Sequence, residues 1–374
     1  MPRALSRSTL TGGYPLNDRI DILNHHPGNG RTRRPRVALA LGGGGARGFA
    51  HLGVLHVLRK AGVPVDMVVG TSAGAIVGAL YCLEPDLDAI IERVGTHTRS
   101  DNFRRSRIRK PFSSRIAGRH TSFFAALTQA VKKRIAYQLL VSRGSLFKSE
   151  RLAQSIRSLV GDAHFEHASI PFHAIALDLT SGEEIVLSSG PLFDALVASS
   201  SLPGYFSPFR MGELELVDMG FICAIPVSAA LRLGADVVIA SAISASGSFP
   251  DVPEDPTGLD VVLRTTTIAA NMLERQELAR ADVVLRPDVR GSHWADFDGQ
   301  LEYMIKGRIA AERGLPELLA TLALRGVPTV PGGDVPMEPG PRPDSGRRPD
   351  VAEDPTASRH WTDDMGQTPA HELG

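Results

Sequence analysis

A serine between two glycines stands where an apolar stretch gives way to a run of small and aliphatic residues. Residues 63–69 are typical of a short buried strand, and residues 73–83 are typical of a helix packed on a sheet. A sharp turn from strand to helix strains the backbone at its serine and projects the hydroxyl above the sheet edge. We therefore predict that Ser72 is a nucleophile, although a small-residue turn that merely lets a helix approach a sheet has the same pattern. The other residues of the predicted turn are Gly70, Thr71, Ala73 and Gly74.

A glycine-rich stretch precedes this turn and fits G-x-G-x-x-G between an apolar strand and a helix. A dinucleotide-binding loop would use Asp66 on the ribose, but Asp66 precedes the apolar core of its strand instead of following it. A phosphate loop would need Gly-Lys-Ser or Gly-Lys-Thr, which this stretch lacks. An oxyanion hole at the same sheet edge as Ser72 is the strongest interpretation, because one backbone N–H donor contributes about 3 kcal/mol to such a site. Its predicted residues are Gly43, Gly44, Gly45, Ala46, Arg47 and Gly48.

A nucleophilic serine needs a general base, and the sequence offers two kinds. The histidines that follow Ser72 include four for which an ordinary structural role is favoured: His164, His167, His173 and His293. Asp218 ends the stretch 214–217, which is typical of a strand, and in a parallel sheet its carboxylate would reach the edge that carries Ser72. Partial burial would raise the pKa of Asp218 toward the range of a useful base. From the residues alone, this role and a simple Asp-x-Gly turn are evenly balanced.

Strand and helix patterns alternate around these residues. Residues 36–41 and 63–69 are predicted strands, residues 49–61 and 73–83 are predicted helices, and this order is typical of a parallel sheet with right-handed crossovers. Further strands are predicted at 172–178, 184–187, 214–217, 236–240 and 283–286. Further helices are predicted at 192–199, 227–233, 257–280 and 303–325, the last one broken near Gly314.

Composition excludes several classes of function. The chain has 374 residues, of which 43% are hydrophobic, and this is enough for a sizeable core. Lys plus Arg and Asp plus Glu are balanced at 41 each, so we expect no nucleic-acid partner. Two cysteines, Cys82 and Cys223, are too few for a disulfide framework or a four-cysteine zinc site. No apolar run reaches ~18 residues and no secretory signal is evident, which predicts a cytoplasmic protein.

The two ends of the chain differ in composition from the middle. Residues 1–35 are rich in Gly, Pro, Arg and Asn, and residues 329–374 contain Pro-Gly-rich stretches with scattered acids. Neither end offers enough apolar side chains to fold, so we predict two disordered tails around one globular unit at 36–328.

Several motifs of this unit occur in the same order as in a known family. They are Gly42–Leu55, Gly70–Ala75, Pro171–Glu183, Ala198–Pro208 and Val217–Gly220. With these motifs, residues 36–310 resemble the patatin-like phospholipases. The resemblance implies an α/β fold, namely a three-layer α/β/α sandwich with a mostly parallel central sheet, and hydrolysis of phospholipid or other lipid acyl esters without a metal or cofactor. It also implies that Ser72 is the nucleophile, that Asp218 is its base, and that the amides of residues 43–48 form the oxyanion hole.

The chain departs from the family's pattern beside the predicted base. The family usually has Asp-Gly-Gly or Asp-Gly-Ala where this chain has Asp218, Met219 and Gly220. A methionine disfavours a positive φ and adds bulk, and Cys223 and Ala224 replace two asparagines that commonly follow. An acyl hydrolase is therefore the predicted function, and a catalytically weakened module that binds lipid or protein is the alternative. A dinucleotide-dependent oxidoreductase is a third hypothesis.

A basic segment interrupts the unit at about residues 99–143, where Asp101 is the only acid. Five of its apolar residues recur at every fourth position, which is typical of one helical stripe: Phe123, Leu127, Val131, Ile135 and Leu139. A basic amphipathic helix suits an anionic membrane surface, so we predict peripheral contact at the inner membrane face. A lid over the acyl site and a helix packed on the core with a solvated basic face are the alternatives.

Overall fold

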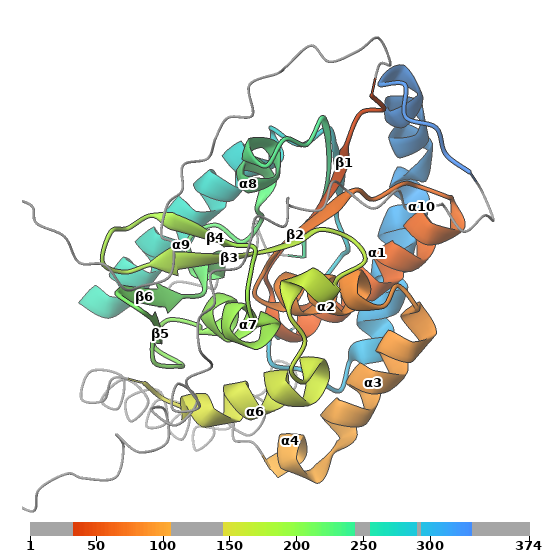
Figure 1. Ribbon diagram of the computed structural model, residues 1–374. Coiled ribbons are helices and arrows are strands. Elements are labelled where there is room, and N and C mark those ends of the chain that lie inside the picture. The colour runs from red at the N-terminus through yellow and green to blue at the C-terminus, as the bar shows by residue number, and fades with distance from the viewer. Residues whose placement is uncertain (1–32, 106–144, 244–254, 290–292, 331–374) are drawn as a thin grey trace, which may run out of the picture. The chain divides into compact units, whose positions relative to one another are not determined.

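One mixed sheet runs through the residues that the computed structural model describes, which are 33–105, 145–243, 255–289 and 293–330 (Figure 1). These residues all belong to the first of two compact units, 1–338; the second, 339–374, lies outside them. Residues 106–144 of the predicted basic segment also lie outside the described ranges, as do residues 1–32 and 331–374 of the two predicted tails. The strands are β1 (Val37–Leu41), β2 (Met67–Thr71), β3 (Phe172–Asp178), β4 (Glu184–Leu187), β5 (Phe209–Met211), β6 (Leu214–Val217), β7 (Val237–Ser241) and β8 (Val283–Leu285).

The central part of the sheet is parallel. The strand order is β5-β6-β3-β2-β1-β7-β8, and the strands from β3 to β8 in this order all run in one direction. The chain moves from β1 to β2 and β3 on one side and returns to β7 and β8 on the other, so β1 lies at the topological switch point, where open α/β sheets bind ligands. Leu41 is level with Gly70 of β2 and Ser241 of β7. The loop after β1 therefore begins beside the turn after β2.

The margin of the sheet beyond β2 is antiparallel. Along β3, β2 pairs with residues 172–175, β4 with residues 174–177 and β6 with residues 177–178. Because β4 overlaps both of the other partners, it occupies one edge of β3, and β2 and β6 share the other edge. β2 is parallel to β3 and β6 is antiparallel to it, so β2 and β6 point at each other with their carboxyl ends.

Helices cover both faces of this sheet (Figure 1). They are α1 (Phe49–Lys60), α2 (Ala73–Leu83), α3 (Leu87–Arg99), α4 (Asp101–Arg105), α6 (Ser149–Val160), α7 (Leu192–Ser200), α8 (Val227–Arg232), α9 (Gly258–Leu278) and α10 (Gln300–Leu324), with short 3-10 helices η1 (Gly45–Gly48), η2 (Phe165–His167) and η3 (Met219–Phe221). Alternate residues of β1 enter two separate cores, because Leu39 packs with α1, α2, α3, α6, α7 and α10, whereas Ala40 packs with α8 and the end of α9. The predicted three-layer α/β/α class is confirmed. None of the helices in the described ranges is long and apolar enough to span a membrane.

Helix α10 differs from its prediction. The predicted break near Gly314 is wrong, because α10 is continuous and includes Pro316. Gly314 approaches β8 so closely that a Cβ atom there would lie 2.6 Å from Leu285 Cδ2. Ala311 and Leu318, which lie on the same helical face, are buried. Packing on the sheet therefore overrides the low helix propensity of glycine and proline.

Asp66 lies at the amino end of β2, at the opposite end of the strand from Gly70. Its carboxylate accepts a hydrogen bond from the Val37 amide (2.7 Å) and pairs with Arg34 (2.5 Å). The residue therefore joins the chain before β1 to the start of β2. It is too far from the glycine loop to bind a ribose there, which agrees with the rejection of the dinucleotide interpretation.

Candidate active site

Ser72 occupies a strained turn between β2 and α2. It is the N-cap residue of α2 and has φ 55° and ψ −122°. Among the described residues it is the only non-glycine residue with a positive φ. A conformation of this kind costs about 1–3 kcal/mol and persists only where the surrounding structure fixes it. The structure therefore contains a sharp strand-to-helix turn at Ser72, at the carboxyl end of β2.

The glycine loop lies across the first turn of α2. It leaves β1, forms η1 and continues directly into α1. A Cβ atom at Gly43 would lie 3.2 Å from the Ser72 Cβ atom, and a Cβ atom at Gly48 would lie 2.7 Å from the Ala73 Cβ atom. Side chains at these two glycines would push the loop away from Ser72.

Some backbone amides of this loop donate hydrogen bonds within the protein, and others do not. Three of them donate within the protein: the N–H groups of Gly43, Ala46 and Arg47 reach the carbonyls of Ala224 (2.9 Å), Trp294 (2.6 Å) and Gly44 (3.3 Å). In the part of the chain that the structure describes, no acceptor contacts the N–H groups of Gly44 and Gly45. These two amides therefore remain available to an anion.

Asp218 directly follows β6. It lies close to Ser72 because the carboxyl ends of β2 and β6 face each other along one edge of β3. The last residue of β2 pairs with Ile175 and the last residue of β6 pairs with Leu177, so only Ala176 of β3 separates the two strand ends. The expectation that the strand before Asp218 is parallel to its neighbours is wrong, because β6 is antiparallel to β3. The two side chains meet nevertheless, because opposed strands share one edge of β3.

The Asp218 carboxyl group is buried, with 3% of the residue exposed. The backbone N–H of Asp218 donates to the Ser201 carbonyl (2.9 Å), and the carboxyl Oδ1 atom accepts from the Gly220 amide (2.7 Å). Burial raises the pKa of Asp218 to about 6, and hydrogen bonds from the Ser72 hydroxyl and the Gly220 amide partly offset this rise. At neutral pH the group is therefore mostly a carboxylate that accepts a hydrogen bond from Ser72.

Met219 is accommodated in this turn without a positive φ. It begins η3, and among the described residues only glycines and Ser72 have positive φ. Its side chain packs against the core on the α8 side of the sheet. The next departure from the family's pattern, Cys223 and Ala224, keeps a link to the loop, because the Ala224 carbonyl accepts from the Gly43 amide.

The end of α7 holds the backbone of both Ser72 and Asp218, and the sequence interpretation missed this contact. The Ser199 hydroxyl accepts from the Ser72 N–H (2.9 Å) and donates to the Ile175 carbonyl of β3 (2.7 Å). Two residues later, the Ser201 carbonyl accepts from the Asp218 N–H. The one signal in the sequence is a run of three serines at the end of a predicted helix, and a run of this kind does not reveal its partners.

His51 holds the start of the glycine loop and was also missed. It is fully buried in α1, where Nε2 contacts the Gly42 carbonyl (2.8 Å) and Nδ1 contacts the Ser241 hydroxyl (2.9 Å). Because a carbonyl only accepts, Nε2 carries the hydrogen and Nδ1 accepts from the hydroxyl. Burial lowers the pKa of His51 to about 4, so the ring is neutral at pH 7. The signal in the sequence is a histidine inside an otherwise apolar helix.

Among the described residues, no histidine hydrogen bonds with Ser72 or Asp218. His173 lies on β3 and hydrogen bonds with a serine hydroxyl after β4 (2.7 Å), and burial lowers its pKa to about 4. His164 and His167 contact each other beside η2, and His293 accepts from a backbone amide in its own turn. The described ranges also contain no group of three His, Cys, Asp or Glu side chains that could hold a metal ion.

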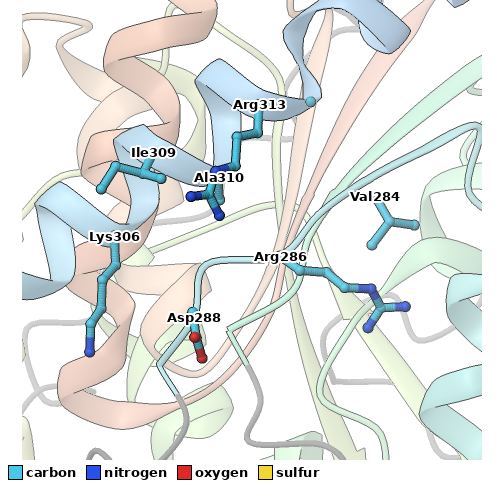
Figure 2. Close-up of a pocket in the computed structure, with 8 residues that line it drawn as sticks. Val284, Arg286, Asp288, Lys306, Ile309, Ala310 and Arg313 are labelled. Carbon is cyan, nitrogen blue, oxygen red and sulfur yellow. The ribbon is translucent and has the colours of Figure 1, made fainter.

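A hollow of about 550 Å³ lies away from Ser72, between β8 and α10 (Figure 2). Its charged residues are Arg286, Asp288, Lys306 and Arg313. Lys306 pairs with an acid on its own helix (2.7 Å), and Figure 2 shows the Arg286 side chain extending away from the side chains of α10. The three cations therefore do not converge on one point, and this hollow is not part of the candidate site.

Residues 39–231, which include the glycine loop, Ser72 and Asp218, match a family model described as Patatin-like phospholipase. An uncharacterized NTE family protein of Mycobacterium tuberculosis is 31% identical over 225 residues, which cover 59% of this chain and 53% of that protein. Neuropathy target esterase of Drosophila melanogaster is 30% identical over 207 residues, which cover 54% of this chain and 12% of that protein. The chain thus spans about half the length of the mycobacterial relative. Among solved structures, VipD from Legionella pneumophila is similar with a TM-score of 0.43 and 13% identity, over 78% of this chain and 68% of VipD.

Proposed function

The chain belongs to the patatin-like phospholipase family, and from this premise we propose that it hydrolyses acyl esters of phospholipids or other lipids, with Ser72 as nucleophile and Asp218 as base. The observation that supports this most directly is the contact between a serine in a strained turn and a buried carboxyl group whose pKa is raised to about 6. A carboxylate that already accepts a hydrogen bond from the hydroxyl can take its proton, so the reaction needs no histidine.

In the acylation step, the Ser72 Oγ atom attacks the carbonyl carbon of the ester, and the hydroxyl proton moves to the Asp218 carboxylate. The carbonyl π electrons move onto oxygen and give a tetrahedral oxyanion. When this intermediate collapses, the bond to the leaving alkoxide breaks, and Asp218 returns the proton to that oxygen. The products of this step are a free alcohol and an acyl group bound to Ser72.

In the deacylation step, water takes the place of the alcohol. Asp218 accepts a proton from the water, whose oxygen attacks the acyl carbon and again gives a tetrahedral oxyanion. Collapse of this second intermediate breaks the bond to Ser72, and Asp218 protonates the Oγ atom. A fatty acid leaves, and both side chains return to their starting protonation states.

The amides of Gly44 and Gly45 are our proposed donors to both oxyanions. The support for this choice is that they belong to the loop in contact with Ser72 and that their N–H groups have no acceptor in the described part of the chain. Removal of one donor of this kind typically costs about 3 kcal/mol of transition-state stabilisation. Gly43, Ala46 and Arg47 serve the loop differently, because their amides hold its shape.

The alternative of a catalytically weakened lipid- or protein-binding module depended on Met219 and on Cys223 and Ala224. Its motivation is weaker in view of the structure, because Met219 adopts a negative φ and Ala224 still supports the loop. We therefore keep the hydrolase as the proposal, with a lipid ester as substrate and with no nucleic acid, metal or cofactor as partner. A cytoplasmic location with peripheral contact at the inner membrane face stays a prediction.

Fluorophosphonate labelling followed by peptide mapping tests the assignment of Ser72. We expect a covalent adduct on Ser72 and release of fatty acid from short-chain p-nitrophenyl esters and from phospholipid vesicles. Ser72→Ala should abolish the adduct and the turnover, whereas Ser158→Ala, which removes an exposed hydroxyl on α6, should change neither. Wild-type turnover by the Ser72→Ala protein would refute the assignment. Absence of labelling in a protein that still binds vesicles would favour the binding module.

A further inference from the structure

Helix α9 carries large apolar side chains on its solvent-facing side. At 100° per residue, the part of the helix from Val261 to Gln276 has eight residues on one face about 140° wide, which we call the outward stripe: Val261, Val262, Thr265, Ile268, Ala269, Met272, Leu273 and Gln276. The five large apolar members are between 40% and 60% exposed. The opposite face holds Glu274, which is only 5% exposed, and Leu263, which is 45% exposed. A helix packed on a core is expected to cover its large apolar side chains, whereas most of those described in α9 are at least 40% exposed.

The polar groups of this part of α9 are satisfied within the helix. The hydroxyls of Thr265, Thr266 and Thr267 donate to the carbonyls four residues earlier, at 2.9, 3.0 and 2.8 Å. Each threonine therefore offers its methyl group to the surroundings and keeps its hydroxyl on the helix backbone. The threonines therefore lose no hydrogen bond when they leave water, which is the condition for contact with hydrocarbon, and Gln276 is the one polar side chain of the stripe whose amide lies exposed at its end.

The charges of α9 are distributed unequally around the stripe. Arg264 and Arg275 lie along one flank of it. Asp260 closes the capping box at the start of the helix and Glu274 is buried, whereas Glu277, which accepts from the Ser228 amide, lies on the other flank beside Leu273. An apolar face flanked by arginines complements the acyl chains and the anionic headgroups of a membrane surface.

The stripe lies at the end of the sheet that carries Ser72. Helix α9 has 21 residues and is about 31 Å long, whereas β7 has five residues and is about 17 Å long. The chain after α9 returns to the amino end of β7, where the Asp282 amide donates to the Val238 carbonyl. The start of α9 therefore projects past the carboxyl ends of the strands, and Figure 1 shows one end of α9 reaching beyond the strand arrows.

The stripe ends beside a hollow that borders the turn after Asp218. Leu273 lines a hollow of about 470 Å³ together with Met219 and Ile222, which lie one and four residues after Asp218, and with three acids: Glu183, Glu184 and Glu277. Ile222 is itself 39% exposed. Acids therefore interrupt the apolar surface between the stripe and the turn that carries Asp218.

The size of the stripe favours a bilayer over a second copy of the chain. From Val261 to Leu273 the stripe is about 18 Å long, and with the width of one helix its footprint is about 200 Å². A stable dimer needs about 800 Å² from each partner, whereas an in-plane helix needs only to enter the headgroup region by about 5–10 Å. We propose that the outward stripe of α9 is an in-plane membrane contact, and that it presents the Ser72 side of the sheet to a bilayer that contains anionic phospholipids. The choice of a bilayer rests on the proposed lipid hydrolysis.

Flotation with vesicles of phosphatidylcholine and phosphatidylglycerol tests this contact on the full chain. The test variant is Val262→Glu with Met272→Glu, two exposed positions of the stripe. The matched control is Leu301→Glu with Leu324→Glu, which makes the same chemical change at 69% and 88% exposed positions of α10. We expect the test variant to bind vesicles about 100-fold more weakly and the control to bind like wild type, because only the test variant places two carboxylates in the headgroup region.

Turnover of a soluble p-nitrophenyl ester by each variant separates vesicle binding from catalysis. Both double variants should keep the wild-type rate on this substrate, and Ser72→Ala should keep wild-type vesicle binding while it loses turnover. Absence of turnover in the wild-type protein would therefore count against the proposed hydrolase, whereas vesicle binding reports on the stripe separately. Equal vesicle binding by wild type and the test variant would overturn the membrane contact. A wild-type dimer that the test variant converts to a monomer, with vesicle binding unchanged, would assign the stripe to a second copy and overturn it too.

Salt distinguishes the stripe from the basic segment at 99–143. Binding by exposed basic residues alone should disappear at about 0.5 M salt, because the charges are then screened within a few ångströms. Binding through the stripe should persist at this salt concentration in wild type and be lost in the test variant. Complete loss of wild-type binding at high salt would contradict the proposal.

Discussion

The two parts of the sheet position their functional groups by different means. In the parallel part, the glycine loop and the turn at Ser72 come from the first two strands, whose carboxyl ends are level because β1 and β2 are paired neighbours. In the antiparallel margin, Asp218 depends on β3, β6 and the end of α7, which lie far apart in the sequence. The turn and loop of the nucleophile side therefore have local sequence patterns, although Ser199, Ala224 and Trp294 hold them from far along the chain, whereas no local pattern gives the placement of Asp218. Substitutions distant from Asp218 in the chain should consequently alter the base side more readily.

The largest effect is expected from a substitution that removes the base at Asp218 but keeps the geometry around it. Asp218→Asn keeps an oxygen that can accept from Gly220 but cannot take the Ser72 proton. We expect kcat/KM on a soluble ester to fall by about 1000-fold, within the range usual for loss of a general base. Glu215→Gln, on the same strand, is the control and should keep wild-type kcat/KM. A loss of less than tenfold in Asp218→Asn would show that another group acts as base.

The next effect tests whether the Ser199 hydroxyl, at the end of α7, positions the nucleophile. Ser199→Ala removes the acceptor of the Ser72 N–H and the donor to β3. We expect kcat to fall by about 10- to 100-fold with little change in KM, because a small displacement of the nucleophile is costly while substrate binding is unaffected. Ser201→Ala is the matched control, because its hydroxyl only bonds within α7 and its carbonyl, which holds Asp218, remains. Equal losses in the two variants would indicate a general effect on α7 instead of a specific contact.

The same comparison explains what the sequence could and could not predict. The strand, glycine and serine patterns around Ser72 act over a few residues, so the turn and the loop beside it were predictable. The proximity of Asp218 was expected for the wrong reason, since the sequence pattern of β6 shows a strand but not its direction. Ser199, Ser201 and His51 were missed because their partners are set by tertiary contacts. The continuity of α10 was missed because packing on β8 outweighs the local propensities of Gly314 and Pro316.

A smaller effect follows from the titration of Asp218. Its pKa is raised to about 6, and only the carboxylate can accept the serine proton. We expect kcat/KM to rise with pH and to level off above about pH 6–7, with the value at pH 5 about tenfold below the plateau. Steady-state rates on a soluble ester between pH 5 and 8 measure this limb. A profile that is flat through this range would show that Asp218 does not act as the base.

The same titration affects stability with a definite sign. The folded pKa of Asp218 lies above the ordinary value of 3.8, so the folded state binds this proton more tightly than the unfolded state does. Stability from this group is therefore present below about pH 4 and is lost as pH rises to about 6, by up to about 1.4 kcal/mol per pH unit. Denaturant unfolding of wild type and Asp218→Asn should show the variant gaining relative stability between pH 4 and pH 7. An unchanged difference across that interval would contradict the raised pKa.

The smallest expected effect concerns Met219. Met219→Gly restores the residue common in the family, but the methionine already has a negative φ and packs outside the Ser72 contact. We expect kcat/KM to change by less than about threefold, because no strain is relieved. A gain of tenfold or more would show that the methionine slows the reaction and would revive the weakened-module hypothesis.

The shared edge of β3 has a further consequence. Ser72 and Asp218 follow the ends of β2 and β6, which face each other across one residue of β3, Ala176. Strand β3 contributes neither reacting group, but its length at this point sets the distance between them. Surface loops on either side of β3 can change in length without altering that gap. Insertion or deletion of a single residue between Ile175 and Leu177 would reverse the facing of every later side chain on the strand. Tolerance to length changes along this chain should therefore drop sharply at this short stretch, even though nothing in its aliphatic composition marks it as special.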